Sequence, residues 1–227
     1  MGSINIRQRV IRNLLIDYGR SLSKAGFQRL VIVSSHGGPG HMVALDEAAA
    51  VLSKRHKLST ISLTSRIIFR FLSGKLVDRI GDACERPLTD DERTALRMDY
   101  HAGWWETAMM LLVRPDLVAA DYTSLRDALV PRRKLRHNSP LKPPAGQGYL
   151  GAPSRADAAF ARVSVSVLRE EAETIIGEFL AGSVDLKRFR SPLYKVPLFR
   201  TNFWYWVAAG IVIALVVIRL LSQELLQ

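Results

Sequence analysis

Apolar and polar positions follow two different periods along the first third of the chain. Between residues 6 and 22 apolar side chains recur at helical spacing, at Val10, Leu14, Leu15, Tyr18 and Leu22. The segment Leu30–Val33 is short and β-branched, which predicts a buried strand, and residues 57–63 alternate like a second strand. Between these two predicted strands, a second set of apolar positions at helical spacing predicts another helix. The order helix, strand, turn, helix, strand is typical of a mostly parallel sheet.

The turn after the first predicted strand is rich in glycine. Gly37, Gly38 and Gly40 allow backbone conformations closed to other residues and let a ligand approach the backbone closely. His36 and His41 bring ring nitrogens to the carboxyl end of the strand. Ligand sites of open α/β sheets lie at that edge, so we expect a site here.

A second polar turn, beginning at residue 99, leads into an apolar helix that Pro115 ends. With Gly103 as a hinge, His101 before the helix and Glu106 in its first turns can face one pocket. The alternative is local: His101 caps the helix and Glu106 complements its dipole. Together with His36, however, these side chains are the nitrogen and oxygen ligands of a divalent metal, and three ligands with one open position describe a hydrolytic zinc site.

Charge and cysteine content narrow the class of protein. The formal net charge is +11, but the basic residues gather near the C-terminal apolar segment and in the cluster Arg132–Arg136, and no nucleic-acid motif accompanies either group. We therefore expect no nucleic-acid partner. The single cysteine, Cys84, excludes an internal disulfide framework and fits a reducing compartment.

The C-terminal segment has the pattern of a membrane anchor. Phe203 to Ile218 carries no charge, an aromatic cluster stands at its start, and a basic, proline-containing stretch at residues 183–201 precedes it. We therefore predict a transmembrane helix over residues 202–222 in contact with the lipid bilayer, a tail at 223–227, and a globular domain on the cytoplasmic side. The alternative is a buried core helix.

Four motifs carry a resemblance to a known family. They are Ser34-Ser-His-Gly-Gly38, His101-Ala-Gly-Trp-Trp-Glu-Thr-Ala-Met-Met-Leu111, Arg114-Pro-Asp-Leu-Val118 and Gly148-Tyr-Leu-Gly-Ala-Pro153. Over residues 2–180 the chain resembles the creatininase family of metal-dependent amidohydrolases. The resemblance implies a three-layer α/β/α domain at residues 1–182 with a mostly parallel sheet. The glycine turn also resembles an oxyanion loop of α/β-hydrolases, but no Gly-x-Ser-x-Gly elbow follows it.

The resemblance also implies roles for individual residues. His36 matches a metal ligand of the family, Glu106 matches a glutamate at the metal centre, and His101 matches the proposed proton-transfer histidine. The implied cofactor is a divalent metal, zinc or manganese or iron. The implied partners are a small-molecule amide substrate and further copies of the chain in a homo-oligomer.

Two pairs of residues are candidate substrate contacts. Gly37 and Gly38 lie where a ligand approaches the backbone, and Trp104 and Trp105 are placed to stack on a flat substrate. For the tryptophans, packing or a subunit contact is an equal alternative.

The sequence departs from the family at its start. Members open with a Glu-x-His-Gly-x-His segment and an aspartate that match nothing here, and Gly38 replaces a glutamate ligand of creatininase itself. We therefore expect an N-terminally shortened domain with weakened metal binding. Two functions remain open. One is a membrane-anchored amidohydrolase acting on a carbon–nitrogen bond, and the other is a non-catalytic, membrane-anchored binding protein with the same fold.

Overall fold

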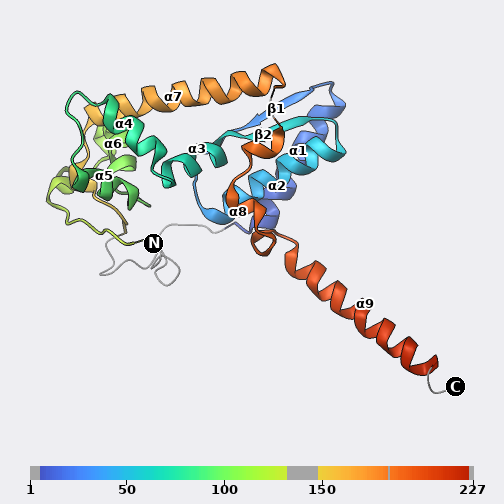
Figure 1. Cartoon of the computed structure of the whole chain (residues 1–227). Helices are drawn as coiled ribbons and strands as arrows, with labels where there is room; N and C mark the ends of the chain where they lie inside the picture. The colour runs from blue at the N-terminus through green and yellow to red at the C-terminus, as the bar shows by residue number, and fades with distance from the viewer. Residues whose placement is uncertain (1–5, 132–147, 184, 225–227) are drawn as a thin grey trace. The chain divides into compact units, whose positions relative to one another are not determined.

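The structure is a computed structural model that describes residues 6–131, 148–183 and 185–224 (Figure 1). The contacts divide the chain into two compact units. We call Ile4–Arg66 with Glu178–Gln227 the sheet unit, and Ile67–Gly177, grouped with Met1–Ser3, the helical unit. The predicted domain at 1–182 contributes to both. The basic cluster at 132–136 lies outside the described residues.

The sheet unit begins with the predicted helix–strand order. Helix α1 (Gln8–Lys24) precedes strand β1 (Arg29–Ile32), and helix α2 (Pro39–Arg55) precedes strand β2 (Ser59–Ser62). The strands pair in parallel, with Arg29 opposite Ser59 and Ile32 opposite Ser62. The predicted parallel pairing is therefore confirmed, and the sheet of the described residues has two strands.

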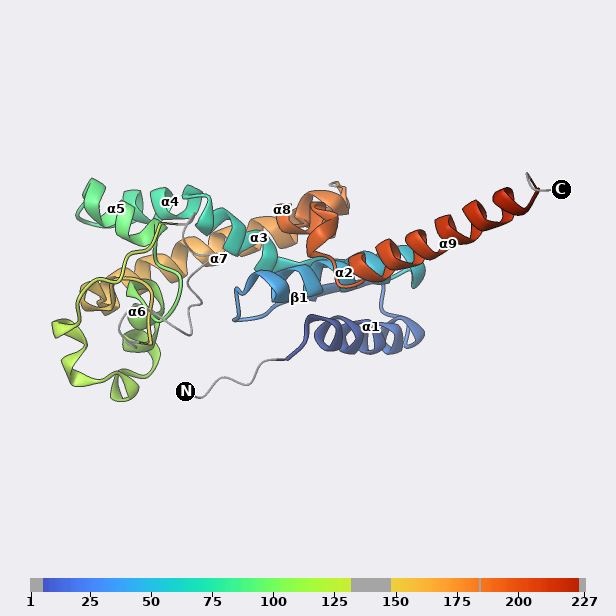
Figure 2. The same cartoon turned by 90° about the horizontal axis from the view of Figure 1, so that it is seen from below.

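Helices α1 and α2 lie side by side (Figures 1 and 2). Gly19 of α1 makes their close approach possible, because a Cβ there would lie 2.4 Å from Cδ1 of Leu52. The face of α1 with Ile11 and Leu15 packs against the buried Ile32 and Leu45. Of the apolar positions predicted for this helix, Leu15 faces the core, whereas Val10, Leu14 and Tyr18 are exposed.

The C-terminal part of the sheet unit is tied to α2 by two acidic side chains. It contains η6 (Leu186–Phe189), α8 (Pro192–Lys195), η7 (Pro197–Phe199) and α9 (Phe203–Glu224). The backbone N–H of Ser191 donates to Oδ2 of the buried Asp46 over 2.8 Å. The backbone N–H of Thr201 donates to Oε1 of Glu47 over 3.2 Å. Burial raises the pKa of Asp46 to about 6.

The predicted transmembrane helix is not supported. In the part of the chain that the structure describes, no helix combines the length and the apolar character that a membrane crossing requires. The predicted span at 202–222 and the membrane localisation are therefore wrong, and contact with the lipid bilayer is not shown.

The helical unit consists of short helices around one apolar cluster. Its elements are α3 (Leu63–Leu72, which starts in the sheet unit), α4 (Lys75–Ala83), α5 (Asp90–Arg97), α6 (Trp104–Val113), η1 (Pro115–Leu117), η2 (Ala120–Ser124), η5 (Pro153–Arg155) and α7 (Ala158–Ala181). Leu76, Ile80, Leu96 and Trp104 are central to its core. The predicted α/β class is confirmed, but helices dominate and the predicted three layers are not observed among the described residues.

The buried carboxylate of Glu171 in this unit is paired with two arginines. Glu171 of α7 is 4% exposed and accepts from Arg70 over 2.8 Å and from Arg79 over 2.7 Å. Helix α5 starts with a capping box, in which Thr89 and Glu92 each accept from the other's backbone N–H. The ion pairs join α3, α4 and α7, and the capping box stabilises the start of α5.

Candidate functional site

The carboxyl ends of β1 and β2 meet at the edge of the sheet where the sequence predicts a site. The Ser34 N–H donates to Oγ1 of Thr64 over 2.7 Å, and the Thr64 hydroxyl donates to the Ser34 carbonyl over 2.8 Å. Thr64 is buried and lies two residues after the end of β2, in the first turn of α3. This reciprocal pair fixes the start of the glycine turn, and sequence reasoning missed it because residues 34 and 64 meet only through the parallel pairing.

The two histidines of the turn lie next to each other. Ser34 Oγ and His41 Nε2 share a hydrogen bond of 2.8 Å, and the rings of His36 and His41 lie 5.2 Å apart, edge to face. Burial, and secondarily the neighbouring His36, lower the pKa of His41, which keeps its imidazole neutral. His36 is exposed. A Cβ on Gly38 would lie 2.5 Å from His36 Nε2, so this placement of His36 needs glycine at position 38.

His101 and Glu106 form a second pair, in the helical unit. His101 Nδ1 lies 3.8 Å from Glu106 Oε2, and the two side chains are 47% and 50% exposed. The same carboxylate oxygen accepts the backbone N–H of Ala102, whose φ of 45° is unusual for a residue with a Cβ. Glu106, rather than His101, therefore satisfies the backbone in front of α6, while the His101 ring remains half-exposed.

Asp99 positions this turn, and sequence reasoning missed it. It is 9% exposed, and its carboxylate accepts the N–H groups of Trp104 and Trp105, each over 2.8 Å, and of Ala152 over 3.3 Å. It thus satisfies the first N–H groups of α6, a role that the N-cap residue usually fills. Burial raises the pKa of Asp99 to about 6. An acidic residue five positions before an apolar helix was the available signal.

Two of the quoted motifs meet in space at this turn. His101 and Leu150 form an antiparallel bridge, with the His101 N–H donating over 3.0 Å and the Leu150 N–H over 2.7 Å. A Cβ on Gly103 or on Gly151 would lie 1.7 or 1.8 Å from Asp99 Oδ1. The glycines of both motifs therefore make room for one buried carboxylate that holds His101 in place.

The candidate substrate contacts lie in different surroundings. Trp104 is 3% exposed and packs on Phe160 with ring centroids 5.1 Å apart, so the packing role accounts for this side chain. Trp105 is half-buried beside Phe71. Both indole Nε1 atoms are buried without a hydrogen-bond partner. Gly37 and Gly38 are half-buried in the turn of the sheet unit.

The described residues do not assemble a complete metal site. His36 and His41 belong to the sheet unit, and His101 and Glu106 belong to the helical unit. Imidazole nitrogen and carboxylate oxygen suit zinc and manganese. However, no three His, Cys, Asp or Glu side chains gather as metal ligands anywhere in the described part of the chain. The residues present thus fit a divalent metal in donor type but not in number.

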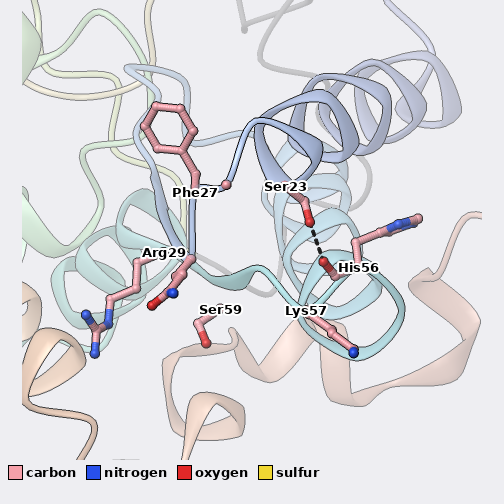
Figure 3. A pocket seen from close by; sticks show the side chains of 8 residues that line it. Ser23, Phe27, Arg29, His56, Lys57 and Ser59 are labelled. Carbon is pink, nitrogen blue, oxygen red and sulfur yellow. Dashed lines mark hydrogen bonds between the residues drawn. The ribbon is translucent and has the colours of Figure 1, made fainter.

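A cavity of about 510 Å³ lies at the opposite edge of the sheet (Figure 3). Ser23, Phe27, Arg29, Lys57 and Ser59 line it, close to the amino ends of β1 and β2, and the Ser23 hydroxyl donates to the His56 carbonyl over 2.6 Å. No predicted site residue lines this cavity. Since sites of open α/β sheets lie at the carboxyl ends, we assign the cavity no chemistry.

Comparison with models of protein families identifies the family of this chain. Residues 1–176 match the family model described as "Creatininase: Creatinine amidohydrolase". The chain belongs to the creatininase family. No curated protein matches the chain. The resemblance that the motifs carried is therefore confirmed, whereas nothing in the comparisons supports the predicted N-terminal shortening.

Solved creatininases share the fold. A creatininase mutant complexed with creatine has 20% sequence identity and a TM-score of 0.54, with 79% of this chain and 68% of that chain covered. "Creatininase Mn" has 19% identity and a TM-score of 0.52, covering 79% and 67%. A zinc–zinc mutant form has 20% identity and a TM-score of 0.53, covering 78% and 67%. At these identities the similarity establishes the creatininase-like α/β fold.

Proposed function

We propose that this member of the creatininase family hydrolyses a carbon–nitrogen bond in a small linear or cyclic amide. The observation that carries the proposal is the half-exposed His101–Glu106 pair on a backbone that Asp99 holds rigid. A histidine exchanges protons near neutral pH, and a fixed backbone limits the positions that its ring can take. The family membership supports the same chemistry.

In this proposal His101 transfers the proton to the leaving nitrogen of the amide. Breaking a carbon–nitrogen bond produces an amine that is a poor leaving group until it is protonated, so a positioned acid accelerates the step. The Glu106 carboxylate lies 3.8 Å from His101 Nδ1, beside the ring that carries the proton. His101 is then the catalytic residue, and Asp99 is a positioning residue.

Zinc and manganese are the ions to test, because the solved neighbours include zinc–zinc and manganese forms. His36 and Glu106 are the ligands that we propose from the resemblance. Metal content after loading and dialysis, measured by elemental analysis, should fall in His36→Ala and Glu106→Ala. It should stay unchanged in His56→Ala, since His56 lies at the other edge of the sheet. Equal metal content in all four proteins would contradict these ligands.

Creatinine is the first amide to assay, with zinc or manganese supplied and ring opening followed by product analysis. We expect His101→Ala to lower kcat/KM by about 100-fold or more, as typical for loss of a general acid, while His56→Ala retains the activity. Unchanged turnover in His101→Ala would overturn the assigned role. Failure of creatinine alone redirects the search to other cyclic amides, which the same variants test.

A second function is a non-catalytic binding protein with the creatininase fold. The observation that favours it is that the described residues gather fewer than three metal ligands. Calorimetry with creatine or creatinine separates the two functions, because a binder shows saturable heat without turnover. Self-association, which the resemblance also implies, is tested by light scattering after size-exclusion chromatography.

A further inference from the structure

A second cavity in the sheet unit has the side chains of an anion site. It encloses about 490 Å³ between the face of α2 that carries Glu47, Val51 and Lys54 and the segment that leads from α8 into α9. We call it the α2–α9 pocket, and its charged and aromatic lining consists of Arg12, Glu47, Lys54, Arg55, Tyr194, Arg200, Phe203 and Trp206. Its volume lies within the range of about 300–1,000 Å³ of small-molecule sites.

The pocket carries an excess of positive charge. Four cationic side chains line it, whereas Glu47 is its one acidic lining residue, and both Glu47 oxygens accept from Thr201. Among the described residues Lys54 and Arg55 make no ion pair, whereas Arg12 lies 3.9 Å from Glu47 and Arg200 Nε donates to the Tyr194 carbonyl over 3.0 Å. Two cations in a hollow without an acidic partner favour an anionic ligand.

Arg12 adds a desolvated donor. Its Nε atom is buried and has no hydrogen-bond partner, and it lies 3.9 Å from Oε2 of Glu47, beyond hydrogen-bond distance. A buried donor without an acceptor is costly, and a bound anion would satisfy it.

One aromatic ring at this pocket is open for stacking. Both Arg190 and Arg200 place a guanidinium group over the Tyr194 ring, at 5.0 and 4.5 Å from its centroid, so Tyr194 is occupied. Trp206 also lines the pocket and is 75% exposed. An indole offers a planar ligand a large apolar face.

We propose that the α2–α9 pocket binds a nucleoside phosphate, with the phosphate on Lys54, Arg55 and Arg12 and the base on Trp206. The combination of clustered cations with one exposed indole matches a ligand that carries both a phosphate and a flat ring. Within the sheet unit the pocket lies away from the glycine turn. Lys54 stands thirteen residues beyond His41 on the same helix, about 20 Å along its axis.

Calorimetry on the full chain tests the proposal with adenosine monophosphate, adenosine and inorganic phosphate as probes. We expect adenosine monophosphate to bind about tenfold or more tightly than either fragment, and its affinity to fall as salt is raised. No saturable binding at millimolar adenosine monophosphate would overturn the proposal. Equal affinity for inorganic phosphate would remove the role of the ring.

Matched variants locate the site. Lys54→Gln with Arg55→Gln should weaken adenosine monophosphate binding about tenfold or more, while Arg29→Gln with Lys57→Gln, which removes the same charge from the cavity of Figure 3, should change it less than about twofold. Equal losses in both pairs would mean general charge attraction and refute the site.

The ring contact has its own pair of variants. Trp206→Ala should weaken binding of the nucleotide and leave that of inorganic phosphate unchanged. Trp204→Ala, on a ring that is 66% exposed outside the pocket, should affect neither. The substituted residues are all exposed, so each variant should keep the melting temperature of the unsubstituted protein, as measured by circular dichroism. The same loss for Trp204→Ala would contradict the assigned stacking.

Discussion

Replacing Gly103 with alanine should unfold the turn that holds His101. The new Cβ would lie 1.7 Å from Oδ1 of Asp99 and 2.9 Å from the Cα of Gly151, and neither neighbour is the free end of a flexible side chain. The Asp99 carboxylate would have to leave its place, and three backbone N–H groups would lose their acceptor.

The magnitude follows from those three hydrogen bonds. Hydrogen bonds to a charged group contribute about 1.5–3 kcal/mol each, and the bond from Ala152 is long at 3.3 Å. Allowing for partial solvation after the turn opens, we expect a loss of about 3–5 kcal/mol, a large share of the roughly 5–15 kcal/mol of a typical protein. For a chain of this size that corresponds to a fall in Tm of roughly 10 °C.

Urea denaturation followed by circular dichroism measures the effect, and Gly177→Ala is the matched control. Gly177 is exposed in the interior of α7, and a Cβ there meets nothing within 4 Å. That substitution should therefore raise stability by about 0.5–1 kcal/mol. If Gly103→Ala changes the free energy of unfolding by less than about 0.5 kcal/mol, the steric argument and the role of Asp99 are both refuted.

Three further predictions concern buried or capping groups. Asp46 has a pKa of about 6 in the folded state and about 3.9 in the unfolded state, so the folded protein binds more protons. Its contribution therefore lowers the free energy of unfolding by about 2–3 kcal/mol as the pH rises from 4 to 7. Asp46→Asn should remove this contribution in urea titrations at several pH values, and an unchanged pH dependence would contradict it. Glu171→Ala leaves Arg70 unpaired and leaves Arg79 with Glu170 alone, so it should cost about 2–4 kcal/mol, whereas the exposed Glu173→Ala should cost less than about 0.5, as measured by thermal melts. Thr89→Ala removes the cap of α5 and should cost about 1 kcal/mol, and no loss would show the capping box to be unimportant.

The sequence predicted what depends on neighbours along the chain. The strand at Leu30–Val33 appears as β1 at Arg29–Ile32, and its parallel partner, β2, lies within residues 57–63, because a short β-branched or alternating run next to a helical stripe suits few other structures. The helix after Gly103 was likewise predicted and is observed as α6. The motifs around His36 and His101 were enough to find the family.

Local pattern also misled at the C-terminus. An uncharged apolar run with an aromatic start predicts a membrane span, but no helix in the described part of the chain is long and apolar enough for one.

Only the tertiary structure placed Asp99, Thr64 and Gly151. Asp99 acts through the N–H groups of α6 and of Ala152, and Thr64 acts through Ser34, thirty residues away. Such contacts form when strands pair and loops close, and of these residues only Asp99, an acidic residue shortly before an apolar helix, carries a local signal. A buried carboxylate acquires its shifted pKa and its structural role from groups that contact it in the folded chain. The sequence by itself therefore identified the candidate histidines, whereas the tertiary structure determined which residues hold their turns in place.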